Sequence, residues 1–326
     1  MTAHYKINGI RLNRHLIELT RKNQKGEAHI GGPGRQNSGS GAALYQGMAD
    51  HQKNLVLLVR SGIEDSVLSS GVMQAKYFDP DILPDLMIES YRQVSTVSIY
   101  PHNYQLPPLA SLLSFLDREQ LRFRQLVSSN AMLTFVIDAH GCDEFVDRIS
   151  SVFELPPTHT PFEQEEDEEQ EAFIRRKYPE TRASYVEAKI KTYGVVAKSG
   201  LTLSVHDLPF FQNGLLDKAL APIQATEQFV FLSAWMRDGT NGCFVLITQD
   251  PEADGPRIRL PVDMLTIQGP HFGDRWGIIH RTFSCLHDRQ VPLLFSGCTG
   301  ASISLVFSQG MGEEAIDALQ DVFETA

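Results

Sequence analysis

The stretch from Asp263 to Phe323 has a pattern of apolar and turn-forming residues that few folds can satisfy. It predicts a strand, a helix, two strands and a second helix, over residues 264–267, 278–287, 291–295, 302–307 and 312–323. Gly269 and Gly277 bracket the loop between the first strand and the first helix. The chain therefore ends in one small module in which two helices cover one face of an antiparallel sheet.

The order of elements in this module is most of the ferredoxin-like split βαβ unit, and the rest of the chain repeats it. The copies begin near four positions, Ala28, Ser95, Gly194 and Asp263. Their spacing is nearly constant once the turn-rich and acidic segment 156–190 is set aside, as expected for tandem modules. The third copy lacks a closing helix, because residues 251–261 are rich in Pro and Gly.

The second copy is well formed. A strand with alternating polarity is predicted over 94–100, and Pro107 and Pro108 are well placed at the start of the next helix. An apolar stripe at helical spacing follows, made of Leu109, Leu112, Leu113 and Leu116. Two paired strands over 123–128 and 132–137 and a closing helix over 143–153 complete this copy.

The predicted fold class is α+β, with tandem ferredoxin-like (βαββαβ) modules whose antiparallel sheets are covered by helices on one face. An apolar series that ends in a basic cluster at 21–25 predicts an N-terminal helix over residues 1–25. The remaining segments are a degenerate module at 26–92, a module at 93–155, an acidic linker or helix at 156–190, a module at 191–255 and a final module at 262–326.

Composition excludes several classes of protein. The net charge of −11 over 326 residues argues against a general nucleic-acid binder or a protein that binds anionic membranes. The first 24 residues lack the apolar core of a secretory signal, and no apolar run is long enough for a transmembrane helix. The four cysteines have no CxxC spacing, so we expect reduced thiols and a cytoplasmic protein.

Motifs for catalysis are weak. The glycine-rich run 31–41 lacks the Gly-Lys-Ser/Thr ending of a P-loop, and its sequence is compatible with a flexible turn or with phosphate binding. No His-Glu-x-x-His, Cys/His cluster or Gly-x-Ser-x-Gly occurs. We therefore expect no catalytic residue, no metal site and no cofactor.

The fourth copy resembles an ACT domain, in particular the regulatory ACT domains of aspartate kinases. Its first loop and helix read Phe-Gly-Asp-Arg-Trp-Gly-Ile-Ile over 272–279, where that family tends to have Gly-x-x-Asp-x-Pro-Gly. The strand 302–307 and the helix positions Glu313, Ala315, Leu319 and Phe323 also match the family pattern. The second copy is similar in order. Two departures stand out, Trp276 in place of the usual proline and Leu-Pro-Pro at 106–108 in the second copy.

The resemblance implies that modules pair their sheets side by side and bind an amino acid where they meet. A helix N-terminus suits the carboxylate, and an acidic side chain such as Asp274 suits the ammonium group. The ligand-binding residues expected on this basis are His102, Asn103 and Tyr104 in the second copy and Gly273, Asp274, Arg275, Gly277 and Ile278 in the fourth.

The function that this resemblance implies is a non-catalytic regulator that binds an amino-acid effector and either forms a homodimer or docks onto a partner enzyme. Two alternatives remain open. One is an enzyme related to aspartate kinase, with a reduced phosphate-handling segment in residues 1–90. The other is a structural scaffold without a ligand, which the departures at Trp276 and Pro107 favour.

Overall fold

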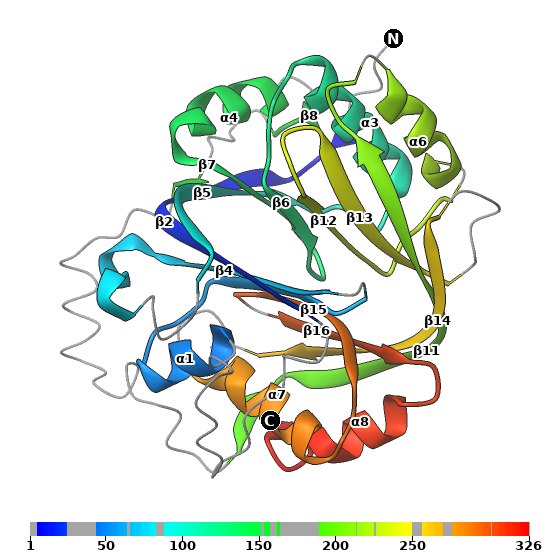
Figure 1. Ribbon diagram of the computed structural model, residues 1–326. Coiled ribbons are helices and arrows are strands. Elements are labelled where there is room, and N and C mark those ends of the chain that lie inside the picture. The colour runs from blue at the N-terminus through cyan, green and yellow to red at the C-terminus, as the bar shows by residue number, and fades with distance from the viewer. Residues whose placement is uncertain are drawn as a thin grey trace. The chain divides into compact units, whose positions relative to one another are not determined.

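The structure is a computed structural model. It describes residues 5–24, 44–63, 66–82, 88–150, 153–156, 162–163, 189–212, 214–224, 226–249, 256–269, 276–300 and 302–325. The chain divides into two compact units, each assembled from three separate stretches (Figure 1). Unit 1 consists of Met1–His15, Gln93–Gln164 and Gly200–Pro261, and unit 2 consists of Leu16–Arg92, Glu165–Ser199 and Val262–Ala326.

The order strand, helix, strand, strand occurs four times along the chain. The division between the units falls inside four long strands, β2 (Gly9–Gln24), β5 (Ser90–Tyr100), β11 (Gly194–Pro209) and β14 (Ile258–Gln268). Each of these strands opens one of the four repeats. Because each strand contributes residues to both units, neither unit is a continuous piece of sequence.

Unit 1 contains the second and third repeats. Its further elements are β1 (Tyr5–Lys6), α3 (Leu106–Arg118), β6 (Gln125–Ser128), β7 (Leu133–Asp138), the 3-10 helix η3 (Ala139–Gly141), α4 (Cys142–Ser150), β8 (Phe153–Glu154), β9 (Phe162–Glu163), α6 (Leu215–Gln224), β12 (Phe231–Met236) and β13 (Asn241–Thr248). Its strands follow the order β11-β13-β12-β6-β7-β5-β2. The pairs from β11 to β5 are antiparallel. The seam between the two repeats is the β12–β6 pair.

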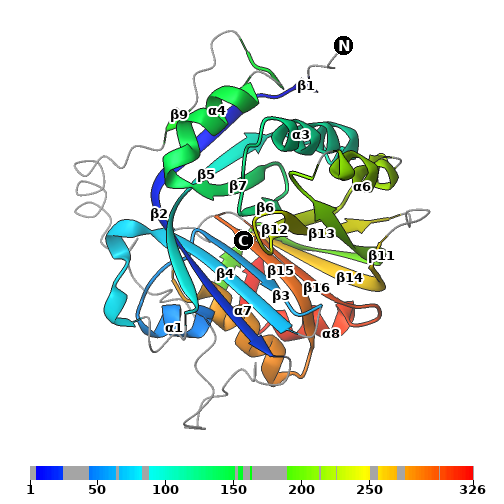
Figure 2. The same ribbon diagram turned by 45° about the horizontal axis from the view of Figure 1, so that its top comes forward.

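Helices α3, α4 and α6 lie on one face of the unit 1 sheet, and α3 packs beside α6 (Figure 2). The leucine stripe explains why α3 packs against the sheet. Its four members are at most 3% exposed: Leu109, Leu112, Leu113 and Leu116. Prolines stand in the first turn of α3, where a missing N–H costs least. The helix predicted from this stripe is therefore confirmed.

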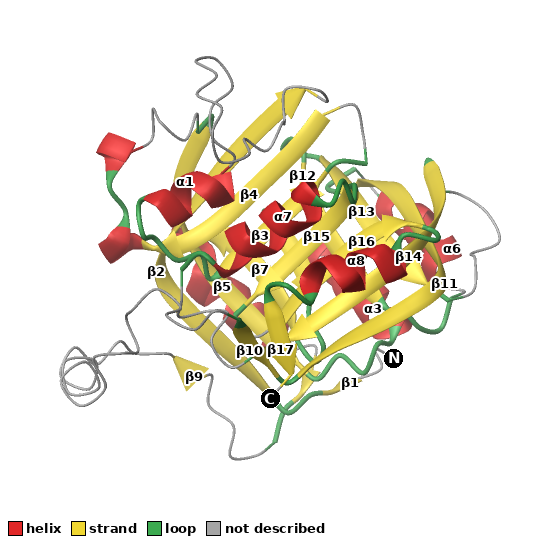
Figure 3. Cartoon of the chain, turned by 90° about the horizontal axis from the view of Figure 1, so that it is seen from below, coloured by secondary structure: helices red, strands yellow, loops and turns green. Residues whose placement is uncertain are grey.

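Unit 2 contains the first and fourth repeats. Its further elements are α1 (Leu44–Asp50), β3 (Leu57–Ser61), β4 (Ser66–Gln74), the 3-10 helices η1 (Ala75–Tyr77) and η2 (Pro80–Ile82), β10 (Ile190–Thr192), α7 (Ile278–Asp288), β15 (Leu293–Thr299), β16 (Ser302–Ser308), α8 (Gly312–Leu319) and β17 (Phe323–Thr325). Its strands follow the order β2-β4-β3-β15-β16-β14, and β15 pairs antiparallel with β3 at the seam. Helices α1, α7 and α8 lie across this sheet (Figure 3).

The expected N-terminal helix over residues 1–25 is wrong, because Gly9–Gln24 forms strand β2. Ile10 and Leu12 pack in the core of unit 1, and Ile17 and Leu19 pack in the core of unit 2. Between these pairs, His15 has a φ of 56°. Together with Leu16, the two alternating runs place apolar residues four positions apart (Leu12 and Leu16) and three positions apart (Leu16 and Leu19), a spacing that imitates helical periodicity.

Several expectations fall on residues outside the described ranges. These include the glycine-rich run 31–41 and most of the acidic segment 156–190. Two of the predicted closing helices are shorter than expected, since α4 ends at Ser150 and α8 ends at Leu319, and short strands follow both. Among the described helices, none combines the length and apolarity needed to cross a bilayer.

Candidate ligand-binding site

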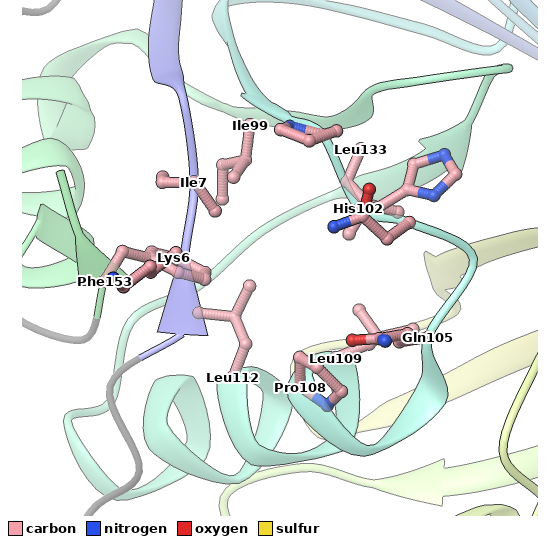
Figure 4. Close-up of a pocket in the computed structure, with 12 residues that line it drawn as sticks. Lys6, Ile7, Ile99, His102, Gln105, Pro108, Leu109, Leu112, Leu133 and Phe153 are labelled. Atoms are coloured by element: carbon pink, nitrogen blue, oxygen red, sulfur yellow. The ribbon is translucent and has the colours of Figure 1, made fainter. Parts of the chain in front are cut away.

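Unit 1 contains a cavity of about 230 Å³ between the end of β5 and the start of α3 (Figure 4). It is lined by Lys6, Ile7, Ile99, Pro101, His102, Asn103, Gln105, Pro108, Leu109, Leu112, Leu133 and Phe153. The segment 101–105, called here the 101–105 loop, forms one wall. Two of the three residues predicted in the second copy, His102 and Asn103, therefore line a cavity.

The 101–105 loop is held by the imidazole of His102, which is 8% exposed. Its Nδ1 accepts a hydrogen bond from the Tyr104 N–H at 2.9 Å, so the ring proton is on Nε2. Nε2 donates that proton to the Ser129 carbonyl oxygen at 2.7 Å. Burial lowers the pKa of His102, and the hydrogen bond to Ser129 opposes this shift in part. His102 is therefore a neutral residue that holds the loop through one hydrogen bond at each ring nitrogen.

Two consecutive loop residues, Asn103 and Tyr104, have φ values of 51° and 57°. Left-handed backbone is rare for an aromatic residue and persists only where its surroundings hold it. Tyr104 is held on both sides, because its N–H donates to His102 and its carbonyl accepts from the Phe229 N–H at 2.9 Å. Its ring also contacts His102 and Phe229. Tyr104 shapes the loop without lining the cavity.

The start of α3 offers few free donors for an anion. Pro107 and Pro108 have no N–H, and the Leu106 N–H donates to the Glu227 carbonyl at 3.1 Å. The N-cap residue, Gln105, makes no capping hydrogen bond with its side chain. A carboxylate bound here would consequently depend on side chains at the rim rather than on the helix terminus.

Charged groups near the cavity are at its rim. Lys6 is a lining residue, and its ammonium nitrogen is 3.6 Å from a carboxylate oxygen of Glu154. Both side chains are solvent-exposed, at 81% and 55%. Among the described residues that line the cavity, Lys6 and His102 are the ionisable ones and none is a carboxylate. The remaining lining is therefore uncharged and mainly aliphatic, with the amides of Asn103 and Gln105 as its other polar side chains.

The fourth-copy site is different. Gly277 and Ile278 line a cavity of about 20 Å³ in unit 2, with Tyr45, His280 and other residues of α1 and α7. A space of this size holds about one water molecule. Gly277 has a φ of 84° and occupies the N-cap of α7, which glycine tolerates best. The other predicted residues, Gly273, Asp274 and Arg275, lie outside the described part of the chain.

Tyr45 is the most unusual residue at this second cavity. It is 4% exposed, its ring packs edge-on against Phe283, and its hydroxyl has no partner among the described residues. Burial raises the pKa of this phenol to about 12, and the guanidinium groups of Arg60 and Arg21 act in the opposite direction. The hydroxyl therefore stays protonated across the physiological range.

Sequence reasoning missed the residues that the N-terminal segment brings to the larger cavity. Ile7 and Lys6 reach it because β1 pairs in parallel with β8, and the Ile7 N–H donates to the Glu154 carbonyl. Phe153 lies on β8, in a stretch expected to be helical. This pairing joins residues almost 150 positions apart, and no local pattern indicates it.

Comparison with known proteins gives fold-level similarity. No protein-family model and no curated protein sequence matches the chain. The aspartate kinase from Synechocystis has a TM-score of 0.69 and 12% identity over 99% of this chain and 56% of that chain. The ligand-free regulatory subunit of aspartate kinase from Thermus thermophilus has a TM-score of 0.35 and 13% identity. That alignment covers 42% of this chain and 100% of the subunit. The chain thus spans 56% of the Synechocystis kinase chain and has a similar mixed α/β fold with large antiparallel sheets.

Proposed function

We propose that this chain is a regulatory or sensor protein that binds an amino acid or a related small metabolite through ACT-like modules. The similarity in fold to an aspartate kinase supports this class of protein. The four strand–helix–strand–strand repeats and their side-by-side pairing through β12–β6 and β15–β3 support the modular reading. Under this proposal the four modules open at strands β2, β5, β11 and β14, so the first module begins near Gly9 rather than at residue 26.

One observation carries the proposal. The loop predicted to bind a ligand in the second copy borders a cavity of about 230 Å³, which has room for a small metabolite. The corresponding cavity at Gly277 and Ile278 measures about 20 Å³. The second-copy cavity is therefore the first place to look for the effector.

Isothermal titration of the full chain against the twenty amino acids tests this function. We expect at least one to bind, and we expect Asn103→Ala at the larger cavity to weaken it. The control is Asp274→Ala, in the fourth-copy loop. If the control alone weakens binding, the effector site is the fourth-copy loop and Gly273, Asp274 and Arg275 form it. No binding at millimolar concentration would favour a scaffold without a ligand.

A related enzyme is the second candidate. Its support is that the aspartate kinase from Synechocystis covers 99% of this chain, together with the glycine-rich run 31–41. An ATP-dependent phosphorylation assay, with Arg35→Ala as the variant, separates the two functions. Turnover that disappears in the variant would establish the enzyme, and absence of both turnover and nucleotide binding would remove it.

The proposed regulator acts either as a homodimer or on a partner enzyme. Light scattering of the purified chain with and without the effector measures self-association directly. A monomer under both conditions would leave the partner enzyme as the target.

A further inference from the structure

We infer that the cavity beside the 101–105 loop selects a branched aliphatic group carried on a carboxylate, as in an aliphatic α-amino acid or the matching 2-oxo acid. This inference rests on the proposed function, because it names the class of ligand for the same cavity. It excludes amino acids whose side chains are charged or hydroxylated.

The walls of the cavity are the first argument. Ile7, Ile99, Leu109 and Leu112 surround the space in Figure 4, and each is at most 5% exposed. Leu133 closes another side and is 6% exposed. Walls made of branched aliphatic side chains complement a branched aliphatic ligand, and one missing methylene in such a pocket typically lowers binding by about tenfold or more.

The absence of an inner charge is the second argument. His102 is the ionisable residue of the loop wall, and its two nitrogens already bond to Tyr104 and Ser129. In Figure 4 its imidazole is turned away from Ile7 and Leu112. No carboxylate occurs among the described lining residues. A lysine ammonium or a threonine hydroxyl placed among the aliphatic side chains would lose its hydration without gaining a side-chain partner there.

The rim supplies the third argument. Lys6, Asn103 and Gln105 are exposed lining residues, so a carboxylate held at the rim meets a cation and two amides. The ion pair of Lys6 with Glu154 is solvent-exposed and contributes little to folding, so the lysine can turn to a ligand. Glu154, beside it, is then available to an α-ammonium group, which an oxo acid lacks.

Titration calorimetry of the full chain tests the inference with four probes, L-leucine, 4-methyl-2-oxopentanoate, L-lysine and L-threonine. We expect leucine or its oxo acid to bind at least tenfold more tightly than lysine and threonine. Loss of affinity for leucine alone in Glu154→Gln would identify the amino acid as the natural form. If Glu154→Gln lowers the affinity for leucine and for its oxo acid equally, or lowers neither, the protein recognises the carboxylate and the aliphatic tail.

Two variants place the ligand. Leu112→Phe fills the cavity and should abolish binding, whereas Leu112→Met keeps the volume and should preserve it. Because a core substitution can disturb folding, Lys6→Met provides an independent test at the surface. It should weaken binding a few-fold, whereas Lys198→Met, at an exposed position that does not line the cavity, should leave binding unchanged.

Three results would overturn the inference. Lysine or threonine binding as tightly as leucine, and lost in Leu112→Phe, would refute aliphatic selection while the proposed function stands. Leucine binding that survives both Leu112→Phe and Lys6→Met would refute the site. Failure of every amino acid and oxo acid to bind at millimolar concentration would refute the proposed function as well.

Discussion

At the scale of single residues, His102 carries the most consequence. In the folded chain its Nδ1 accepts a hydrogen bond from the Tyr104 N–H. A second ring proton would have to bind at Nδ1 and would break that hydrogen bond. The folded pKa of His102 is lowered from 6.5, mainly by burial. The unfolded chain therefore takes up a proton more readily as the pH falls through 6.5, and folding stability decreases with it.

We accordingly expect the free energy of unfolding to decrease between pH 7 and pH 5, and to decrease less in His102→Gln. Urea titrations at several pH values measure this difference. The matched control is His140→Gln, at an exposed position, which should keep the wild-type dependence. A His102→Gln variant with the same pH dependence as the wild type would show that this imidazole does not control the loop.

Asp263 gives a second prediction at this scale. Its carboxylate is 4% exposed and accepts from the N–H groups of Gly310 and Gly312, at 2.8 and 3.2 Å. Asp263→Ala leaves these two donors without that acceptor, and we expect a loss of about 2–4 kcal/mol in unfolding free energy. Thermal and urea unfolding measure the loss. Asp317→Ala, exposed on α8, should change stability by less than about 0.5 kcal/mol.

At the scale of elements, the seam between β6 and β12 joins two repeats. Besides the ladder, the Ser128 hydroxyl donates to the Leu232 carbonyl at 3.1 Å and accepts from the Leu232 N–H at 2.9 Å. Ser233 donates to the Leu126 carbonyl at 3.1 Å in the opposite direction. These side chains are at most 2% exposed, so water cannot replace the bonds.

Ser128→Ala should therefore destabilise unit 1 by about 1–3 kcal/mol, because the buried Leu232 groups lose that partner. Urea unfolding provides the measurement. Ser199→Ala, at an exposed strand position, is the control and should have little effect. A loss no larger than that of the control would mean that the backbone ladder alone holds the seam.

Prediction from sequence succeeded at the elements with a single strong period. The leucine stripe of α3 and the amphipathic run of α7 place both helices, with ends within a few residues of those observed. The prediction failed at β2, because this strand contributes side chains to two cores. The alternation of its buried side chains shifts at His15, and local sequence does not reveal that shift. His102 and Asn103 were found through a resemblance in loop position, whereas Ile7 and Phe153 depend on a distant strand pair.

At the scale of the whole molecule, each unit draws strands from both halves of the sequence. Unit 1 needs β6 from the first half and β12 from the second, and unit 2 needs β3 and β15 in the same way. A fragment of residues 1–164 therefore leaves the partner edges of β6 and β3 unpaired. Exposed edges of this kind promote aggregation.

We expect fragments 1–164 and 189–326 to aggregate when each is produced alone and to co-purify as a complex when produced together. Affinity purification through a tag on one fragment, followed by circular dichroism, measures both results. The intact chain is the control. A monomeric fragment that unfolds cooperatively by itself would contradict this dependence between the halves.

The β6–β12 seam has one more consequence. Because both strands belong to one polypeptide, pairing of their modules is a unimolecular event with a high effective concentration fixed by the intervening chain. Dilution cannot separate them, as it would separate modules carried on different chains. A response that depends on this pair would consequently have the same midpoint at low and at high cellular abundance of the protein.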